Sequence, residues 1–380
     1  MNIVVAIDSL KGSLTSLEAG NAIKEGILRV EQDANVFVRP LADGGEGTVE
    51  ALVEGMNGTY QTVSVTGPLG DKVESVYGII EETKTAIIEM SAAAGITLVP
   101  ENQRNPLNTT TYGVGEIIVD ALKKGIRRFI IGIGGSATND CGIGMLQALG
   151  YEFLNQEGKQ VPYGAKGIQG IVSICSEHVM PELKESNFLI ACDVTNPLCG
   201  ENGCSAIYGP QKGATEDMVH NMDQWILAFA NLAKQSYPHA NPMTPGTGAA
   251  GGLGFAFLTF TNAELQSGIQ IVLKETKLEN YVKECDYVIT GEGRLDGQTA
   301  MGKAPIGVAK LAKQHDKVVL AFAGCVTPEA KECNKEGIDA FFPILRSLIS
   351  YEEAMDATIA KTNMMNTVEQ VFRLIQVTTK

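Results

Sequence analysis

The chain has 380 residues, which is enough for two or three domains. Hydrophobic residues make up 44% and charged residues 19%, an ordinary composition for a soluble protein that excludes a mainly disordered chain. The formal net charge of −14 argues against nucleic acid or an anionic membrane as a partner, because both bind a basic face.

Strands and helices alternate in the first sixty residues. Residues 3–8 form an apolar run that predicts a buried strand, and residues 16–29 carry apolar side chains at helical spacing. A second strand at 35–40 and a second helix at 48–55 repeat the pattern. This alternation predicts a parallel sheet that is covered by helices.

The middle of the chain departs from this pattern. Three strands, at 60–65, 73–80 and 85–89, follow one another closely, and the turn-rich link at 66–71 predicts hairpins. A mixed α/β region follows. Its expected elements are strands at 129–133 and 188–193 and helices at 113–124 and 218–235.

The strand–helix alternation returns after about residue 285. Strands are expected at 287–290, 318–323 and 340–343, with a helix at 305–313 and a helical C-terminal segment. The pattern predicts an α/β protein with a Rossmann- or flavodoxin-like doubly wound domain formed by both chain ends. That domain would comprise residues 1–60 and 286–380, and residues 61–285 would form a second, mixed α/β domain inserted in it.

Three features bear on the compartment. Residues 240–263 carry no charge, but Pro242, Pro245 and five glycines interrupt them, so no membrane span is expected. The start of the chain has a strand pattern and lacks the basic and apolar regions of a signal peptide. The eight cysteines include no CxxC pair, which favours reduced thiols in a cytoplasmic protein over a zinc site.

Glycine is over-represented, with 42 residues, and many of these glycines form clusters that follow strands. Such loops allow a backbone to approach an anion closely, and helix N-termini after them bind phosphate. We therefore favour ligand binding over simple tight turns as their role. The four clusters lie at 42–48, 132–142, 246–254 and 291–303.

Known nucleotide-binding motifs match these clusters only in part. Residues 297–303 match GxxxxGK, but Ala304 replaces the hydroxyl residue that binds Mg²⁺ in a P-loop. The GxGxxG at 246–251 follows proline-rich sequence instead of a strand. The GxGGSA at 132–137 does follow a strand, but the acid about twenty residues on, Glu152, begins a strand pattern. An NAD(P)-dependent oxidoreductase therefore stays an alternative, as does a non-catalytic two-lobed protein that binds a small acid.

Acids and lysines accompany the glycines. The carboxylates lie in the glycine loops or just after strands, and Lys11 and Lys303 occupy similar positions. The chain lacks a GxSxG elbow and an HExxH helix, so the common hydrolase types are disfavoured. Carboxylates, lysines and glycine loops together suit phosphoryl transfer, which depends on positioning and charge neutralisation. The carboxylates are Asp8, Asp43, Glu46, Asp140, Asp193, Glu292 and Asp296.

Taken together, several motifs resemble the glycerate kinase type I family. The matches run in order from residue 3 to residue 324, with Ile7 and Leu10 where many members have Pro and Phe, and Cys141 where many have Gly. They comprise DSLKGSL at 8–14, ADGGEGT at 42–48, VTGPLG at 65–70, residues 132–140 with GMLQALG at 144–150, CDVTNPL at 192–198, YGPQKGA at 208–214 and residues 290–303.

The resemblance implies ATP- and Mg²⁺-dependent phosphorylation of D-glycerate in the cytoplasm. Bacterial members are associated with the 2-phosphoglycerate product, although 3-phosphoglycerate stays open here. The family fold implied is two α/β domains with the active site in the cleft between them. We expect a monomer or a homodimer that binds no nucleic acid and no membrane.

Residue roles within this function are hypotheses. Asp193 or Asp296 would be the base for the glycerate hydroxyl, and Lys11 or Lys303 would neutralise the transferring phosphate. Each could instead cap a turn or face solvent. Arg294 would bind the substrate carboxylate through its planar guanidinium. The metal-binding candidates are Asp43, Glu46 and Glu292, and the other substrate- or nucleotide-binding candidates are Asp8, Ser9, Gly134, Gly135, Ser136, Thr138, Asn139 and Asn196.

Overall fold

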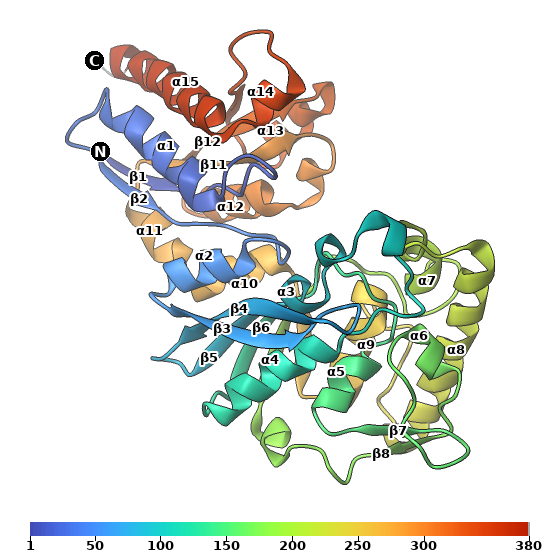
Figure 1. Cartoon of the computed structure of the whole chain (residues 1–380). Helices are drawn as coiled ribbons and strands as arrows, with labels where there is room; N and C mark the ends of the chain where they lie inside the picture. The colour runs from blue at the N-terminus through green and yellow to red at the C-terminus, as the bar shows by residue number, and fades with distance from the viewer. Residues whose placement is uncertain (379–380) are drawn as a thin grey trace. The chain divides into compact units, whose positions relative to one another are not determined.

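The computed structural model describes residues 1–378, which form two compact units (Figure 1). The first unit contains Met1–Asp43, Glu50–Asn57 and the chain from Ile269 onward, so both chain ends belong to it. The second unit contains Gly44–Val49 and Gly58–Gly268. The return to the first unit at Ile269 comes earlier in the chain than the predicted boundary at 285/286.

The first unit contains a five-stranded, fully parallel sheet in the order β13-β12-β11-β1-β2. Counted along the chain, this is the strand order 2-1-3-4-5 of flavodoxin-like folds, which confirms the predicted doubly wound domain. The order reverses between β1 and β11, and ligands in such sheets bind beyond the carboxyl ends of the strands at that point. The strands are β1 (Asn2–Val5), β2 (Asn35–Val38), β11 (Tyr287–Leu295), β12 (Val318–Val326) and β13 (Ala340–Pro343).

Helices from opposite ends of the chain pack together on this sheet. Figure 1 shows α1 (Ser16–Leu28) beside α15 (Ala357–Thr378), in blue and red. The helix α1 buries Ile23 and Ile27 on its apolar face, as its periodicity predicts. Gly26 lets the two helices approach, because a Cβ there would lie 2.6 Å from the carbonyl oxygen of Met365. The core of this unit therefore joins residues that are more than three hundred positions apart.

The remaining helices of the first unit explain its boundary. Helix α11 packs against α12 and β1, and Ile269 at the start of α10 lies against Gly307 of α12. Because of these contacts, residues 269–285 belong to the first unit. The helical pattern of this segment does not by itself tell which sheet the helices cover. The helices are α10 (Gly268–Glu275), α11 (Leu278–Glu284), α12 (Ala304–Lys313), α13 (Glu332–Lys335) and α14 (Tyr351–Met355), and α2 (Thr48–Gly55) begins in the second unit and ends in the first.

The second unit contains a six-stranded mixed sheet in the order β10-β9-β6-β5-β4-β3. The three strands β3, β4 and β5 pair antiparallel, which confirms the predicted hairpins, and the pairs from β5 to β10 are parallel. A separate hairpin joins β7 and β8. The strands are β3 (Thr59–Thr66), β4 (Lys72–Ile80), β5 (Thr85–Glu89), β6 (Arg128–Gly132), β7 (Glu152–Leu154), β8 (Ser173–Cys175), β9 (Asn187–Ala191) and β10 (Ala263–Gln266).

Aromatic side chains fill much of the core of the second unit. Phe153 and Phe229 contact each other edge to face, and both rings also lie against Phe260. The helices of this unit are α3 (Ser91–Ala94), α4 (Tyr112–Lys123), α5 (Ile143–Ala148), α6 (Ala165–Ile168), α7 (Cys204–Tyr208), α8 (Glu216–Ser236) and α9 (Ala249–Phe260).

Two predictions on the compartment can be compared with the structure. Within residues 240–263 only α9 is helical, and no helix in the described part of the chain is long and apolar enough to cross a membrane. All eight cysteines are free thiols, and five of them are buried. Buried thiols behave as small apolar side chains, so most of these cysteines contribute to packing.

Candidate active site

Two acidic side chains, Asp8 and Glu292, lie where the strand order reverses: Asp8 comes three residues after the end of β1, and Glu292 belongs to the C-terminal half of β11. The predicted first strand is too long, since β1 ends at Val5, but the Asp8 N–H still donates to the carbonyl oxygen of Gly291, at 2.9 Å. Gly291 is required there, because a Cβ would lie 1.7 Å from the carbonyl oxygen of Phe322. The backbone that carries Asp8 is thereby held beside the residue that precedes Glu292 in β11.

Asp8 is almost fully buried, with 4% of its surface exposed. Its Oδ1 accepts a hydrogen bond from the Ser9 N–H at 2.7 Å. Burial raises the pKa of Asp8 to about 7, the nearby charge of Asp43 adds to the rise, and the Ser9 N–H and Lys11 oppose it. A carboxylate with this pKa can take up and release a proton near neutral pH.

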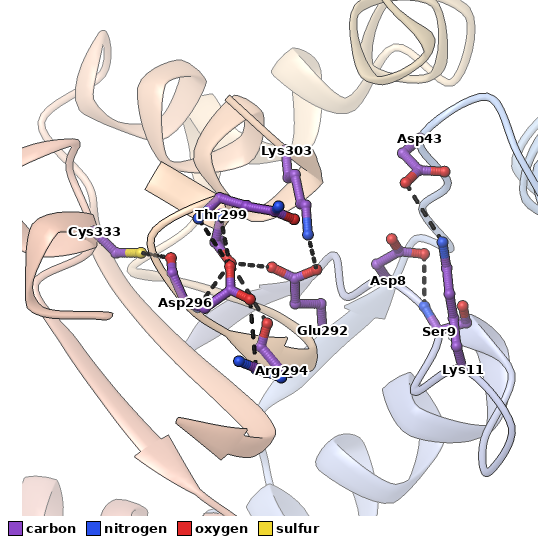
Figure 2. A network of polar contacts seen from close by, with 11 residues as sticks. Asp8, Ser9, Lys11, Asp43, Glu292, Arg294, Asp296, Thr299, Lys303 and Cys333 are labelled. Atoms are coloured by element: carbon purple, nitrogen blue, oxygen red, sulfur yellow. Dashed lines mark hydrogen bonds and ion pairs between the residues drawn. The ribbon is translucent and has the colours of Figure 1, made fainter. Parts of the chain in front are cut away.

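Lys11 lies beside Asp43, with Nζ 3.7 Å from Oδ2 (Figure 2). Burial lowers the pKa of Lys11, but Asp43, Asp8 and Glu292 together raise it above its ordinary value, so the ammonium is retained. The Ser16 hydroxyl stabilises the loops on both sides, because it donates to the Ile7 carbonyl at 2.6 Å and accepts from the Leu41 N–H at 2.8 Å.

Glu292 lies between a hydroxyl and a second lysine (Figure 2). Thr299 Oγ1 donates to its Oε1 at 2.6 Å, and Lys303 Nζ lies 4.0 Å from its Oε2. Burial raises the pKa of Glu292, which Thr299 and Lys303 partly offset. Lys303 is the N-cap residue of α12. The positive end of that helix therefore begins at the lysine that pairs with Glu292.

Asp296 stabilises its own turn. Its Oδ1 accepts hydrogen bonds from the N–H groups of Gln298 at 2.9 Å and Thr299 at 3.2 Å. Arg294 Nε lies 3.4 Å from its Oδ2. Burial acts to raise the pKa of Asp296, but the hydrogen bonds from Thr299 and Gln298, with Lys303 and Arg294, bring it below its ordinary value. A carboxylate stabilised in this way is a weak base, and the Arg294 guanidinium already has an ionic partner.

The three candidate metal ligands belong to different units. Asp43 and Glu292 belong to the first unit, whereas Glu46 is an exposed residue of the second. Among residues 1–378, no group of three or more His, Cys, Asp or Glu side chains is arranged to hold a metal ion. Mg²⁺ is usually bound by one or two carboxylates together with substrate phosphates. Asp43 and Glu292 fit that requirement, because two carboxylates whose charges repel each other would gain from a shared cation, beside Lys11 and Lys303.

A glycine loop follows β6 in the second unit. Gly134 and Gly135 are exposed, and the next residue, Ser136, is buried with 8% of its surface exposed. Thr138 and Asn139 are fully buried; Asn139 Nδ2 donates to Ser205 Oγ at 2.8 Å. In the described part of the chain the Thr138 hydroxyl oxygen and Asn139 Oδ1 have no hydrogen-bond partner. Such atoms need an explanation, for which an unseen water or ligand is the ordinary candidate.

Lys212 lies against this loop and is not among the site residues predicted from the sequence. It is 2% exposed, and its Nζ donates to Ser136 Oγ at 2.8 Å and to the Thr138 carbonyl at 2.7 Å. The signal was available, because Lys212 belongs to the YGPQKGA segment that contributes to the family resemblance. Its burial, however, is not visible in the sequence.

Residues after β9 have structural contacts as well. Asp193 Oδ1 accepts from the Gly268 N–H at 3.2 Å. Asn196 Oδ1 accepts from the Tyr208 hydroxyl at 2.7 Å, and its Nδ2 donates to the Asn202 carbonyl at 2.9 Å. Asn196 therefore holds its own loop in place.

The structure thus gathers the predicted residues into two groups, one in each unit. The first group lies at the ends of β1 and β11 and consists of Asp8, Ser9, Lys11, Asp43, Glu292, Arg294, Asp296 and Lys303. The second unit holds Glu46, Gly134, Gly135, Ser136, Thr138, Asn139, Asp193 and Asn196.

Neither dinucleotide-like glycine pattern has the context that a dinucleotide site needs. The loop after β6 continues to Gly142 before α5 begins, and residues 241–248 ahead of α9 form turns. A dinucleotide fingerprint instead connects a strand directly to a helix N-terminus. The geometry therefore does not favour an oxidoreductase.

Comparison with known proteins agrees with the kinase expectation. The model of the glycerate kinase family matches residues 3–376. A glycerate kinase of Haemophilus influenzae is 48% identical over 375 residues, which is 99% of each chain. A glycerate 2-kinase of Escherichia coli is 46% identical over 93% of each chain. A crystal structure under the name glycerate kinase 2, from Salmonella typhimurium LT2, superposes with a TM-score of 0.91 at 43% identity and covers 100% of this chain and 99% of its own. The chain therefore belongs to the glycerate kinase family, whose members are phosphotransferases.

Proposed function

We propose that the protein transfers the γ-phosphoryl group of ATP to the 2-hydroxyl of D-glycerate, with Mg²⁺, and forms 2-phosphoglycerate in the cytoplasm. The observation that carries the proposal is the group of carboxylates and lysines at the ends of β1 and β11. Phosphoryl transfer needs groups of this kind, which bind anionic oxygens and accept one hydroxyl proton. The name of the Escherichia coli relative, glycerate 2-kinase, supports the 2-position.

Asp8 is the residue we assign as the proton acceptor for the glycerate hydroxyl. It is buried at a strand end, next to Lys11, where a phosphate oxygen could be neutralised. Asp193 remains the second candidate for this role, whereas the engagement of Asp296 in its own turn makes it the weakest. The order of candidates predicts that Asp8→Asn reduces kcat more than either of the other two Asp→Asn changes.

Lys11 and Lys303 would bind the phosphate oxygens from two sides of the carboxylates. Both ammonium groups are half-exposed, with 58% and 39% of the side chain accessible, so a ligand can reach them. Asp43 and Glu292 would hold Mg²⁺, which when bound neutralises and orients the phosphates. An exposed cation near a buried carboxylate suits this task, because it can exchange its protein partner for a phosphate at little cost.

Incubation with ATP, MgCl₂ and D-glycerate tests the function directly. ADP release that depends on D-glycerate is expected, and the product is expected to be converted by enolase without phosphoglycerate mutase. If mutase is needed, the product is 3-phosphoglycerate and the proposed position is wrong. Absence of ADP favours the small-acid binding protein, and a change in NAD(P)H absorbance favours the oxidoreductase.

Removal of the proposed metal ligands is expected to raise the Mg²⁺ requirement. For Asp43→Asn and Glu292→Gln we expect the half-saturating Mg²⁺ concentration to rise at least about tenfold, because each variant removes a negative oxygen ligand. Titration of kcat with MgCl₂ measures this. Glu336→Gln is the control, because Glu336 pairs with Lys310 at 2.9 Å on an exposed part of the same unit. Unchanged titration curves in both ligand variants would reject the metal role.

The pH profile should reflect the ionisation of Asp8. Since its pKa is raised to about 7, a base at this position is protonated and inactive below that pH. We therefore expect kcat/KM to rise about tenfold per pH unit on the acid side and to level off above about pH 7. Profiles of the wild type and of Asp296→Asn should share this acid limb, because the pKa of Asp296 is lowered. An acid limb centred near pH 4 would contradict the assignment.

A further inference from the structure

Lys212 is a buried cation without an anionic partner. Only 2% of its surface is exposed, and in the described part of the chain no carboxylate oxygen lies within ion-pair distance of its Nζ. Moving an ammonium group out of water costs several kcal/mol unless an opposite charge or a full set of acceptors compensates it. An unpaired charge at this depth is most easily explained by a negative ligand that arrives from outside.

The hydrogen bonds of Lys212 both go to the glycine loop after β6. Its Nζ donates to Ser136 Oγ at 2.8 Å and to the Thr138 carbonyl at 2.7 Å. An ammonium group has three N–H donors, so these two bonds leave one donor over. The loop is thus fixed from one side by a positive charge.

The Ser136 hydroxyl keeps its own O–H available for a ligand. Its oxygen accepts from Lys212, and no acceptor for its own O–H lies within hydrogen-bonding distance among residues 1–378. A hydroxyl whose oxygen accepts from a cation is a stronger donor, because the charge polarises the O–H bond. Gly134 and Gly135, which precede it, are exposed, so a ligand can approach the loop at this point. The two unpartnered oxygens of Thr138 and Asn139 lie within three residues of it.

We propose that Lys212 and Ser136 form a relay for oxyanion binding, in which Lys212 positions and polarises the Ser136 hydroxyl and this hydroxyl donates to an oxyanion of a substrate. The inference rests on the proposed phosphoryl transfer, which has two anionic reactants. The carboxylate of D-glycerate and a phosphate of ATP share the required chemistry. Lys212 acts as a positioning residue, and Ser136 makes the contact.

Electrostatics around Lys212 agree with this arrangement. Burial lowers its pKa to about 8, while the neighbouring Cys204 and Asp140 oppose the change. The Asp140 carboxylate is occupied, because it accepts from the Thr111 N–H and hydroxyl, both at 2.8 Å. Asp140 therefore compensates the charge of Lys212 only in part, and an incoming oxyanion would favour its protonated state further.

Calorimetric binding of each reactant identifies the source of the oxyanion. For Lys212→Met and Ser136→Ala we expect the Kd of one reactant, either D-glycerate or the non-hydrolysed ATP analogue, to rise about ten- to a hundredfold, as for a lost hydrogen bond to a charged group. The Kd of the other reactant should change less than about threefold. The double variant should bind no more weakly than Lys212→Met, because both changes remove one relay.

Thr109→Val is the matched control. Thr109 is buried and its hydroxyl donates to the Ala137 carbonyl at 2.9 Å, so this variant weakens the same loop without removing a charge. Equal weakening of both reactants in Lys212→Met, or the same effect in Thr109→Val, would show a merely structural role and overturn the proposal. If Lys212→Met does not fold, Ser136→Ala with unchanged Kd for both reactants overturns it.

Thermal unfolding tests the relay independently of the kinase activity. Inorganic phosphate is the probe, and it should raise the Tm of the wild type more than that of Ser136→Ala or Lys212→Met. Equal shifts in all three proteins overturn the relay, whichever substrate the enzyme uses. Loss of ADP formation in the wild type would overturn the kinase assignment while the phosphate shift still decides the relay.

Discussion

Asp8→Asn is expected to remove most of the activity and to stabilise the folded protein at the same time. The amide cannot accept the hydroxyl proton, so kcat should fall by about 10²-fold or more, the range for loss of a general base. The side chain keeps its size and its acceptor oxygen toward the Ser9 N–H. Steady-state kinetics with saturating ATP, Mg²⁺ and D-glycerate measure the loss.

The gain in stability follows from the raised pKa. In the folded protein the pKa of Asp8 is about 7, above the 3.8 of an exposed carboxyl, so ionisation of Asp8 opposes folding. This cost is fully present above about pH 7 and shrinks as the pH falls, until both states are protonated below a pH of about 3.8. Three pKa units correspond to about 4 kcal/mol, so a gain of roughly 2–4 kcal/mol is expected at pH 8. Urea unfolding at pH 8 and pH 5 should show the gain shrinking at the lower pH.

Asp140→Asn is the matched control, since Asp140 is also a buried carboxylate. It accepts from the Thr111 N–H and hydroxyl and from the Gly142 N–H at 3.1 Å. An amide NH₂ in place of an acceptor oxygen would face these donors, so this variant should lose about 1–3 kcal/mol or more of stability. Stabilisation in both variants would mean that charge removal alone is responsible. Destabilisation by Asp8→Asn would contradict the inference that the ionised Asp8 carboxylate opposes folding.

Lys303→Met is expected to cost about 10²–10³-fold in kcat with little effect on stability. The methionine keeps the apolar stem but removes the ammonium that would face the transferring phosphate, and removal of one such group costs about this much in other enzymes. The ion pair with Glu292 is long, 4.0 Å, and the lysine is 39% exposed, so the free energy of unfolding should change by less than about 1 kcal/mol.

Lys310→Met on the same helix serves as the control. Lys310 pairs with Glu336 at 2.9 Å and is 59% exposed, and its position gives it no role in phosphate binding. Kinetics and urea unfolding of both variants separate the two residues. If Lys303→Met retains kcat within about twofold of the wild type, Lys303 is a surface residue and the proposed phosphate contact is wrong.

Much of the fold could be predicted because its signals are local. The apolar run at residues 3–8, the helical spacing of Ile23 and Ile27, and the turn-rich link before β4 depend on neighbours a few positions apart. The expectation that ligands bind at the strand ends also came from a general rule for open α/β sheets. The end of β1 at Val5 and the inclusion of residues 269–285 in the first unit could not be predicted in this way, because they depend on which sheet each segment covers.

The sequence by itself determined the family, the alternation of strands and helices, and the residue types available for phosphate chemistry, since these are written in short segments and their spacing. Only the tertiary structure decided what each side chain does. Asp296 caps its own turn, Asp8 is buried near the charge of Asp43, and Lys212 is buried against the glycine loop. Burial and charge pairing arise from residues far apart in the chain, and they set the pKa values and free donors on which catalysis depends.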